Sequence, residues 1–305
     1  MREEAVLNLE ERTQTLQLEK KRIVEWSRLA RSHGYNHCSE GWRGFGDKSC
    51  LGYHGYFALL DALDLVSSPR AHEEFYLKGL GYATAEREGN DRPSVLIAGL
   101  ATPALAEIAS RGVEKGTNID IIDICETPLL VTQEAIPILK SEHDLRIKKL
   151  DVLNPEGLLE LANNRRLYSG IVTDAFLTRF KNEEKDQVLE NFSRILRAGF
   201  GCLITTWRIK DERTDERGYG TDRDRTFFLE NALSAAEMLQ IPLSVDEISA
   251  AYEYASTMQS HGGQTLKEIK TIVGRHFKDV RVESTWPYPV YDVVPRFYAK
   301  IQASV

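Results

Sequence analysis

The pattern of apolar and polar positions changes near residue 94. Upstream, apolar residues recur at roughly helical spacings among many charges, and no alternation typical of a strand is visible. A polar, aromatic-rich stretch containing several glycines interrupts this pattern after residue 30, and helical character returns near Tyr56. We expect residues 1–90 to form a helical N-terminal region that serves as a lid or contributes to a substrate site.

Downstream of residue 94, short apolar runs alternate with helical stretches. This alternation predicts an α/β domain over 91–305, in which a mostly parallel sheet carries helices on both faces. The last two runs have too little chain between them for a helical crossover, so we expect an antiparallel hairpin at the sheet edge. The seven expected strands lie within 94–99, 118–125, 145–153, 168–176, 201–207, 280–286 and 296–303.

A helical insertion is expected between the fifth strand and the terminal hairpin, at about 208–276. It opens with a charge-balanced segment that is typical of a solvated loop. The remainder has helical character, and Ser244 followed by Glu247 forms a capping-box pattern at the start of one helix.

Composition restricts the partners of this chain. It has 305 residues, a formal net charge of −7 and no pronounced basic tract, so we do not expect a nucleic-acid partner. The N-terminal residues are polar, and no apolar run approaches the roughly 20 residues that span a bilayer. We expect a cytoplasmic monomer or homodimer, with no membrane partner. The four cysteines form no CxxC pair and are expected to be free thiols.

The turn after the first expected strand indicates a nucleotide site. Gly99 occupies the first glycine position of a dinucleotide-binding turn, but the other two glycines are missing, and no GK[ST] sequence follows. Thr102 is a suitable helix N-cap, and Pro103 suits the first turn of the next helix. The turn therefore favours a nucleotide ligand without phosphates.

Carboxylates at the ends of the next strands extend this pattern. Asp123 lies near the end of the second strand, where an acid can accept hydrogen bonds from both ribose hydroxyls. Asp120 should point to the other face. Asp151 follows the third strand and Asp174 the fourth, although each aspartate taken alone is also compatible with a helix cap or a surface position.

The ordered segments "LIAGLATPAL", "IDIIDICETPLL", "KKLDVLNP", "IVTDAFLTRF" and "ILRAGFGCLITTW" resemble the class I S-adenosylmethionine-dependent methyltransferases. The resemblance implies a Rossmann-like fold and S-adenosylmethionine as the cofactor. Ala101 replaces the second glycine of the family's first motif. The cofactor-binding residues implied by the resemblance are Gly99, Ala101, Thr102, Asp123, Ile124, Asp151, Val152, Asp174, Ala175 and Phe176.

The acceptor pocket is expected from parts outside the sheet. The N-terminal lid and the insertion would both cover the strand ends, which favours a small-molecule substrate. His54 is the leading candidate for a general base, with Tyr53 and Asp174 as further catalytic candidates, although packing also explains a histidine here. The residues expected in the substrate pocket are Trp42, Tyr56, Trp207 and His261, and core packing is the alternative for each aromatic side chain.

No metal site is predicted. His33 and His37 have a helical ligand spacing beside Cys38, but Gly34 and the polar surroundings disfavour a helix there.

Four functions remain open at this stage. The first is methyl transfer to a small molecule, and the second is cyclisation of S-adenosylmethionine itself with release of methylthioadenosine. A nicotinamide-dependent dehydrogenase is disfavoured by the missing glycines. The fourth is a module that binds S-adenosylmethionine without turnover.

Overall fold

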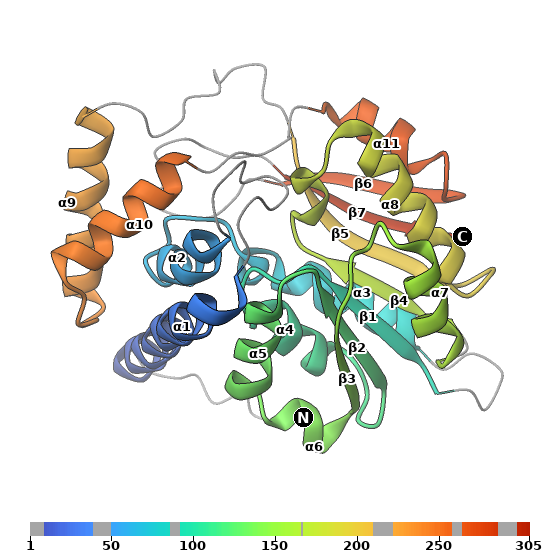
Figure 1. Ribbon diagram of the computed structural model, residues 1–305, viewed down its shortest axis with the longest axis horizontal. Helices are drawn as coiled ribbons and strands as arrows, with labels where there is room; N and C mark the ends of the chain where they lie inside the picture. Colours follow the sequence, from blue (N-terminus) through green and yellow to red (C-terminus); the bar gives the residue numbers. More distant parts are fainter. Residues whose placement is uncertain are drawn as a thin grey trace.

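The predicted α/β sheet is confirmed. A computed structural model describes residues 9–38, 50–85, 92–165, 167–209, 222–257, 264–285 and 298–305 (Figure 1). Within them a seven-stranded sheet has the order β3-β2-β1-β4-β5-β7-β6, and β7 runs antiparallel to the other six strands. The strands are β1 (Ser94–Ala98), β2 (Asn118–Asp123), β3 (Asp144–Lys149), β4 (Gly170–Thr173), β5 (Cys202–Arg208), β6 (Asp279–Thr285) and β7 (Tyr298–Ser304).

The central strands are apolar because helices cover both faces of the sheet. All five residues of β1 are buried, as expected for a parallel strand between two helical layers. The helices on the sheet are α3 (Glu73–Thr84), α4 (Ala104–Gly112), α5 (Glu126–Ala135), α6 (Ile138–Glu142), α7 (Pro155–Asn163), α8 (Asn182–Ile195) and α11 (Leu266–Val273). Two short 3₁₀ helices, η1 (Pro69–His72) and η2 (Phe176–Arg179), complete this part.

Helix α3 belongs to the sheet layers, although the sequence pattern groups it with the N-terminal region. Tyr76 and Leu80 are fully buried in the same core as β1. A Cβ at Gly79 would lie 2.9 Å from the Ile204 side chain, so glycine allows this close contact between α3 and β5.

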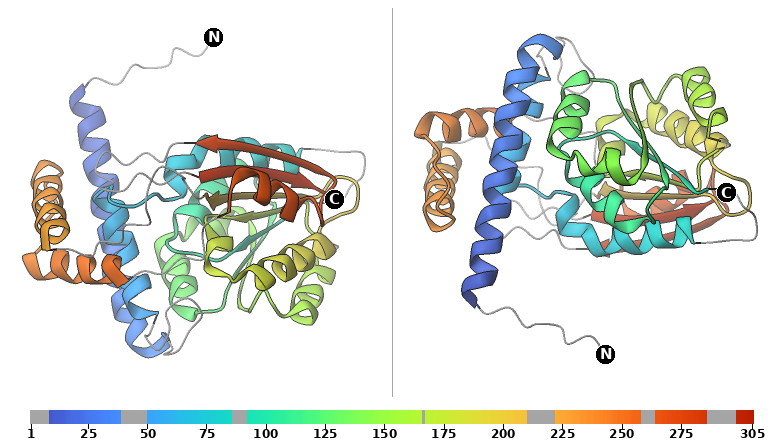
Figure 2. Two further views of the ribbon diagram at one scale, coloured as in Figure 1. Left: turned by 90° about the horizontal axis from the view of Figure 1, so that it is seen from above. Right: turned by 90° about the horizontal axis from the view of Figure 1, so that it is seen from below.

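The remaining helices form a separate layer, which we call the helical cap: α1 (Leu9–His37), α2 (Leu51–Ala62), α9 (Asp222–Met238) and α10 (Val245–Thr257). They share one apolar core, and Figure 2 shows α1 running between α9 and the sheet. The predicted capping box is confirmed, because Ser244 Oγ accepts from Glu247 N at 3.2 Å. The N-terminal region and the insertion thus fold against each other.

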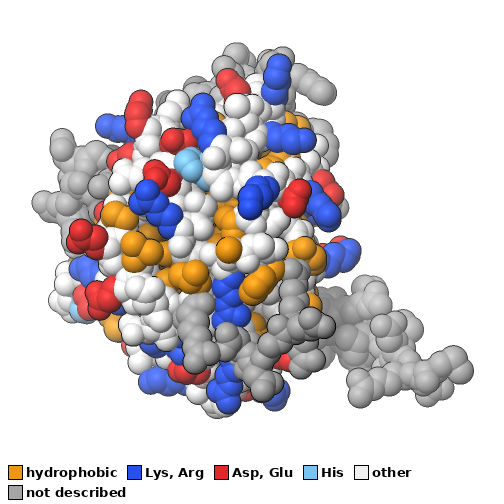
Figure 3. Space-filling view, turned by 90° about the vertical axis from the view of Figure 1, so that its right-hand side faces the viewer, with side chains coloured by type: hydrophobic (Ala, Val, Ile, Leu, Met, Phe, Trp, Pro, Cys, Tyr) orange, Lys and Arg blue, Asp and Glu red, His pale blue; other side chains and the backbone are white. Residues whose placement is uncertain are grey.

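Figure 3 shows basic and acidic side chains interspersed on one face of the molecule, with apolar side chains gathered across its middle. Among the described residues, no helix has the length and apolar character required to cross a membrane.

The turn after β1 depends on glycine for two reasons. Gly99 has a φ of +76°, which lies in the left-handed region that side chains disfavour. A Cβ at this position would also lie 2.1 Å from Cδ2 of Phe176. The ring of Phe176 therefore packs directly on the bare backbone of Gly99.

Asp120 anchors the opposite side of β2, away from the strand ends, as predicted from its position. Its carboxylate pairs with Arg146 and with Arg165, whose Nε lies 3.2 Å away. Tyr168 donates a hydrogen bond to it at 2.5 Å. The Asp120 side chain is only 1% exposed, so these partners compensate for its burial.

The Asp120 cluster should be important for stability. We expect Asp120→Ala to lower the free energy of unfolding by about 3–5 kcal/mol, because it leaves two arginines without their buried counter-charge. Urea denaturation measures this change. Glu74→Ala, which removes the exposed Glu74–Lys78 pair, serves as the control and should leave the unfolding midpoint unchanged. Equal effects of the two substitutions would contradict this interpretation.

The two requirements at Gly99 can be separated by substitution. Gly116→Ala introduces only the backbone penalty, since φ is +84° and no atom lies within 4 Å of the added Cβ. It should lower the free energy of unfolding by about 1–2 kcal/mol. Gly99→Ala should lower this free energy further, because it adds a clash with Phe176. The double variant Gly99→Ala/Phe176→Ala should lose less than the sum of the losses of the two single variants. Additive unfolding free energies would show that the predicted clash is absent.

Candidate functional site

Two adjoining pockets lie at the carboxyl ends of β1, β2 and β4. We call them the apolar pocket and the polar pocket. The apolar pocket has an empty volume of about 400 Å³ and is lined by Gly99, Ile122, Asp123, Ile124, Leu150, Asp151, Val152, Phe176, Arg179 and Phe180. The polar pocket has an empty volume of about 910 Å³, including its open mouth. Its lining residues include Tyr53, His54, Phe57, Gly99, Ala101, Asp123, Asp174, Ala175, Phe176, Arg179, Arg208 and Tyr298.

The two pockets share Gly99, Asp123, Phe176 and Arg179. A ligand that filled both would therefore cross the turn after β1 beside the carboxylate of Asp123. This is the position at which open α/β sheets bind ligands. The sheet and the helical cap both contribute to the polar pocket, because Tyr53, His54 and Phe57 come from α2.

Asp123 fixes the backbone of the turns that follow β1 and β2. Its Oδ2 accepts from the N–H of Leu100 at 2.9 Å, and its Oδ1 accepts from the N–H of Cys125 at 2.8 Å. Each carboxylate oxygen has a second lone pair, so both retain acceptor capacity for a ligand hydroxyl. Burial raises the pKa of Asp123 to about 6. Hydrogen bonds to a ligand would compensate for the burial of its charge.

Asp174 faces the polar pocket from the end of β4. Its Oδ1 accepts from Tyr76 Oη at 2.6 Å and from Thr206 Oγ1 at 2.7 Å, which fixes the carboxylate. Burial raises the pKa of Asp174. The next residue, Ala175, has a left-handed φ of +47°, and its N–H donates to Thr206 Oγ1 at 2.9 Å. The chain turns sharply here and directs Phe176 onto Gly99.

Arg179 is a residue that the sequence reasoning missed. It lines both pockets, and its guanidinium carbon lies 4.7 Å from the centre of the Tyr53 ring. It comes from η2, five residues beyond Asp174, within the segment "IVTDAFLTRF". A basic residue so close to a strand end could have indicated a ligand carboxylate.

Most of the predicted cofactor residues lie together. Nine of them line one or both pockets: Gly99, Ala101, Asp123, Ile124, Asp151, Val152, Asp174, Ala175 and Phe176. Thr102 lines a smaller adjoining cavity with His54 and Ala101. Its Oγ1 accepts from Ala104 N at 3.3 Å, but α4 begins at Ala104 with Pro103 in the cap position, one residue later than predicted.

Two substrate-pocket predictions require correction. Trp207 is fully buried on the side of β5 that faces α8 and α11, where its Nε1 donates to Gln264 at 3.3 Å and Lys185 lies 5.6 Å from its ring. Strand alternation directs Thr206 toward Asp174 instead. Tyr56 lines neither pocket and packs beneath Arg31 in the helical cap. Trp42 and His261 lie outside the described residues.

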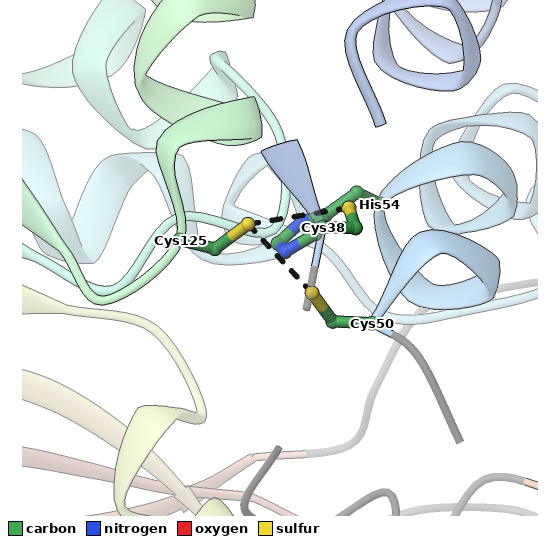
Figure 4. Close-up of side chains that lie close together, drawn as sticks. All are labelled: Cys38, Cys50, His54 and Cys125. Atoms are coloured by element: carbon green, nitrogen blue, oxygen red, sulfur yellow. Dashed lines mark hydrogen bonds between the residues drawn. The ribbon is translucent and has the colours of Figure 1, made fainter. Parts of the chain in front are cut away.

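His54 lies among three of the four cysteines, although these are far apart in sequence. One ligand-type atom each from Cys38, Cys50, His54 and Cys125 lies within 4.8 Å of every other (Figure 4). All four cysteines are free thiols. Cys202 lies elsewhere, in β5. The sequence places Cys38 beside His33 and His37, whereas the structure brings Cys38 together with a different set of possible metal ligands.

Comparisons with known proteins provide only distant structural matches. No family model matches the chain, and no curated protein matches it. Magnesium protoporphyrin IX methyltransferase from Synechocystis PCC 6803, with bound S-adenosylhomocysteine, has 12% identity and a TM-score of 0.46, over 80% of this chain and 87% of that one. An O-methyltransferase family protein from Burkholderia thailandensis has 12% identity and a TM-score of 0.45, over 82% of this chain and 60% of that one.

A third similar structure is the N-methyltransferase NodS from Bradyrhizobium japonicum WM9, in complex with S-adenosylhomocysteine. It has 12% identity and a TM-score of 0.42, over 77% of this chain and 86% of that one.

Proposed function

We propose that this chain is an S-adenosylmethionine-dependent methyltransferase with a small-molecule acceptor. The observation that carries this proposal is the pair of pockets that meet at Gly99 and Asp123. One pocket is apolar, the other contains charged and phenolic groups, and a ribose-binding type of carboxylate lies between them. The first turn has only one of the three glycines that are typical of a pyrophosphate-binding turn. An adenosine joined to a charged amino-acid chain matches this arrangement, in which an apolar pocket, a carboxylate and a polar pocket follow one another.

The adenosine part of the cofactor belongs in the apolar pocket in this proposal. Ile124, Val152 and Phe180 offer apolar surfaces for adenine. Asp151 accepts from Leu153 N at 2.9 Å and retains acceptor capacity for the adenine amino group. Asp123 would accept hydrogen bonds from the ribose hydroxyls.

The methionine part and the acceptor share the polar pocket. Asp174 suits the cationic amino group of the cofactor, and Arg179 suits its carboxylate. The ring of Tyr53 offers an aromatic face for the sulfonium, an attraction of about 0.5–2 kcal/mol. The acceptor would then enter between α2 and the end of β5, near Arg208 and Tyr298.

Methyl transfer requires few catalytic groups. A lone pair of the acceptor attacks the methyl carbon, the carbon–sulfur bond breaks, and its electron pair returns to sulfur. Holding donor and acceptor in line while water is excluded supplies much of the acceleration. Where the acceptor atom carries a proton, a base must accept it. His54 is poorly suited to this role, because its ring lies among the thiols.

Cyclisation of S-adenosylmethionine is a second candidate reaction. In this reaction the deprotonated amino nitrogen attacks the methionine chain, a small ring closes, and methylthioadenosine leaves. Asp174 lines the polar pocket and burial raises its pKa, so this carboxylate is a suitable acceptor for the proton of the amino group.

The reaction products distinguish these two candidates. Incubation with S-adenosylmethionine and a pool of small-molecule acceptors should give S-adenosylhomocysteine and an acceptor heavier by one methylene unit, measured by mass spectrometry. Incubation with the cofactor alone is the control. Methylthioadenosine in that control would favour cyclisation. Cofactor binding without either product across the acceptor pool would contradict both enzymatic proposals.

The ribose assignment is tested at Asp123. We expect Asp123→Ala to raise the dissociation constant for S-adenosylhomocysteine about 10- to 100-fold, because hydrogen bonds to a charged acceptor contribute about 1.5–3 kcal/mol. Isothermal titration calorimetry measures the affinity, and thermal unfolding verifies that the variant is folded. Asp279→Ala, at an exposed position at the start of β6, is the control and should bind normally. Unchanged affinity in a folded Asp123→Ala variant would contradict the assignment.

A further inference from the structure

The four clustered side chains lie at the ends of three separate helices. Cys38 directly follows α1, Cys50 is the N-cap residue of α2, His54 lies in the first turn of α2, and Cys125 is the N-cap residue of α5. Figure 4 shows the three sulfurs and the His54 ring converging on a common centre. The cluster is largely buried, since Cys50 is 1%, His54 2% and Cys125 5% exposed.

The separations match a mononuclear tetrahedral site. Cys125 Sγ lies 3.7 Å from Cys50 Sγ and 4.0 Å from Cys38 Sγ. With zinc–sulfur bonds of about 2.3 Å, the edge between two sulfurs of a tetrahedron is about 3.8 Å. A disulfide requires a separation of about 2.05 Å and would use only two of the three thiols.

His54 provides an independent indication of a missing ligand. The ring is buried, and neither Nδ1 nor Nε2 has a hydrogen-bond partner of normal geometry. Burial of such polar atoms without partners is unfavourable. A metal ion at the common centre would satisfy one nitrogen.

We propose that Cys38, Cys50, Cys125 and His54 bind one Zn²⁺ ion in a closed tetrahedral site. Three thiolates and one imidazole are a donor set that zinc favours, and the harder cations Mg²⁺ and Ca²⁺ prefer oxygen ligands. With four protein ligands the ion has no open position, so its role is structural.

Two helix N-termini and one hydroxyl group adjoin the sulfur atoms of this cluster. Cys50 and Cys125 occupy the cap positions of α2 and α5, where the partial positive charge of a helix N-terminus stabilises an anion. The Thr127 hydroxyl lies 3.3 Å from Cys38 Sγ and can donate to the thiolate.

The bound ion would connect the helical cap to the carboxyl ends of the strands, where the two pockets lie. Two of its ligands hold α2, which also supplies Tyr53 and Phe57 to the polar pocket. Cys125 lies two residues beyond Asp123, and the Asp123 carboxylate accepts from its N–H. His54 would then serve as a metal ligand and not as a base.

Metal analysis of the full-length chain tests the proposal. After purification under reducing conditions, reloading with Zn²⁺ and removal of excess metal, we expect about one zinc per chain by inductively coupled plasma mass spectrometry. Cys125→Ala and Cys50→Ala should lose most of this zinc. The matched control is Cys202→Ala, which removes the buried thiol outside the cluster and should retain it. Absence of zinc in the wild-type chain, or equal loss in Cys202→Ala, would overturn the proposal.

A second measurement avoids variants that fail to fold. X-ray absorption of the zinc-loaded wild-type chain should give three sulfur neighbours at about 2.3 Å and one nitrogen at about 2.0 Å. A thiol-modifying mercurial should release the ion in parallel with modification of three thiols. A shell of oxygen neighbours, or a disulfide between two of these cysteines in the peptide map of the reloaded chain, would contradict the assignment. None of these readouts requires catalytic activity or bound S-adenosylmethionine.

Discussion

The carboxylate of Asp123 joins the two loops on which the candidate site depends. By accepting from Leu100 N and Cys125 N, it fixes the turn after β1 relative to the turn after β2. The first turn contains Gly99, whose bare backbone allows the Phe176 ring to pack against it. The second turn begins α5 and contributes a thiol to the cysteine cluster. One buried acid thereby connects the strand ends, the pockets and the helical cap.

This connection explains why the helical cap is part of the site. The N-terminal helices and the insertion share a core, so α9 and α10 support α1 and α2 from the outside. Helix α2 then presents Tyr53, His54 and Phe57 to the polar pocket. The sheet supplies the positions common to open α/β folds, and the cap supplies the features particular to this chain. In the function that we propose, the cap would therefore determine most of the acceptor specificity.

The sequence predicted the sheet well because its signals are local. Apolar runs with intervening helices define parallel strands, and the short final connection requires a hairpin. The strand-end residues Gly99, Asp123 and Asp174 follow from that topology. Trp207 was misassigned because one residue of register decides which face of β5 a side chain occupies. The cluster of Cys38, Cys50 and Cys125 has no sequence signal, because its spacing results from packing between helices that are distant in the chain.

The central claim is that a single ligand occupies both pockets and crosses between them at Gly99. A crystal structure of the chain with S-adenosylhomocysteine tests this most directly. The account predicts adenine in the apolar pocket near Val152, ribose hydroxyls on Asp123, and the amino-acid chain between Asp174 and Arg179. Electron density for the ligand outside these pockets, or a ribose without contact to Asp123, would contradict the account.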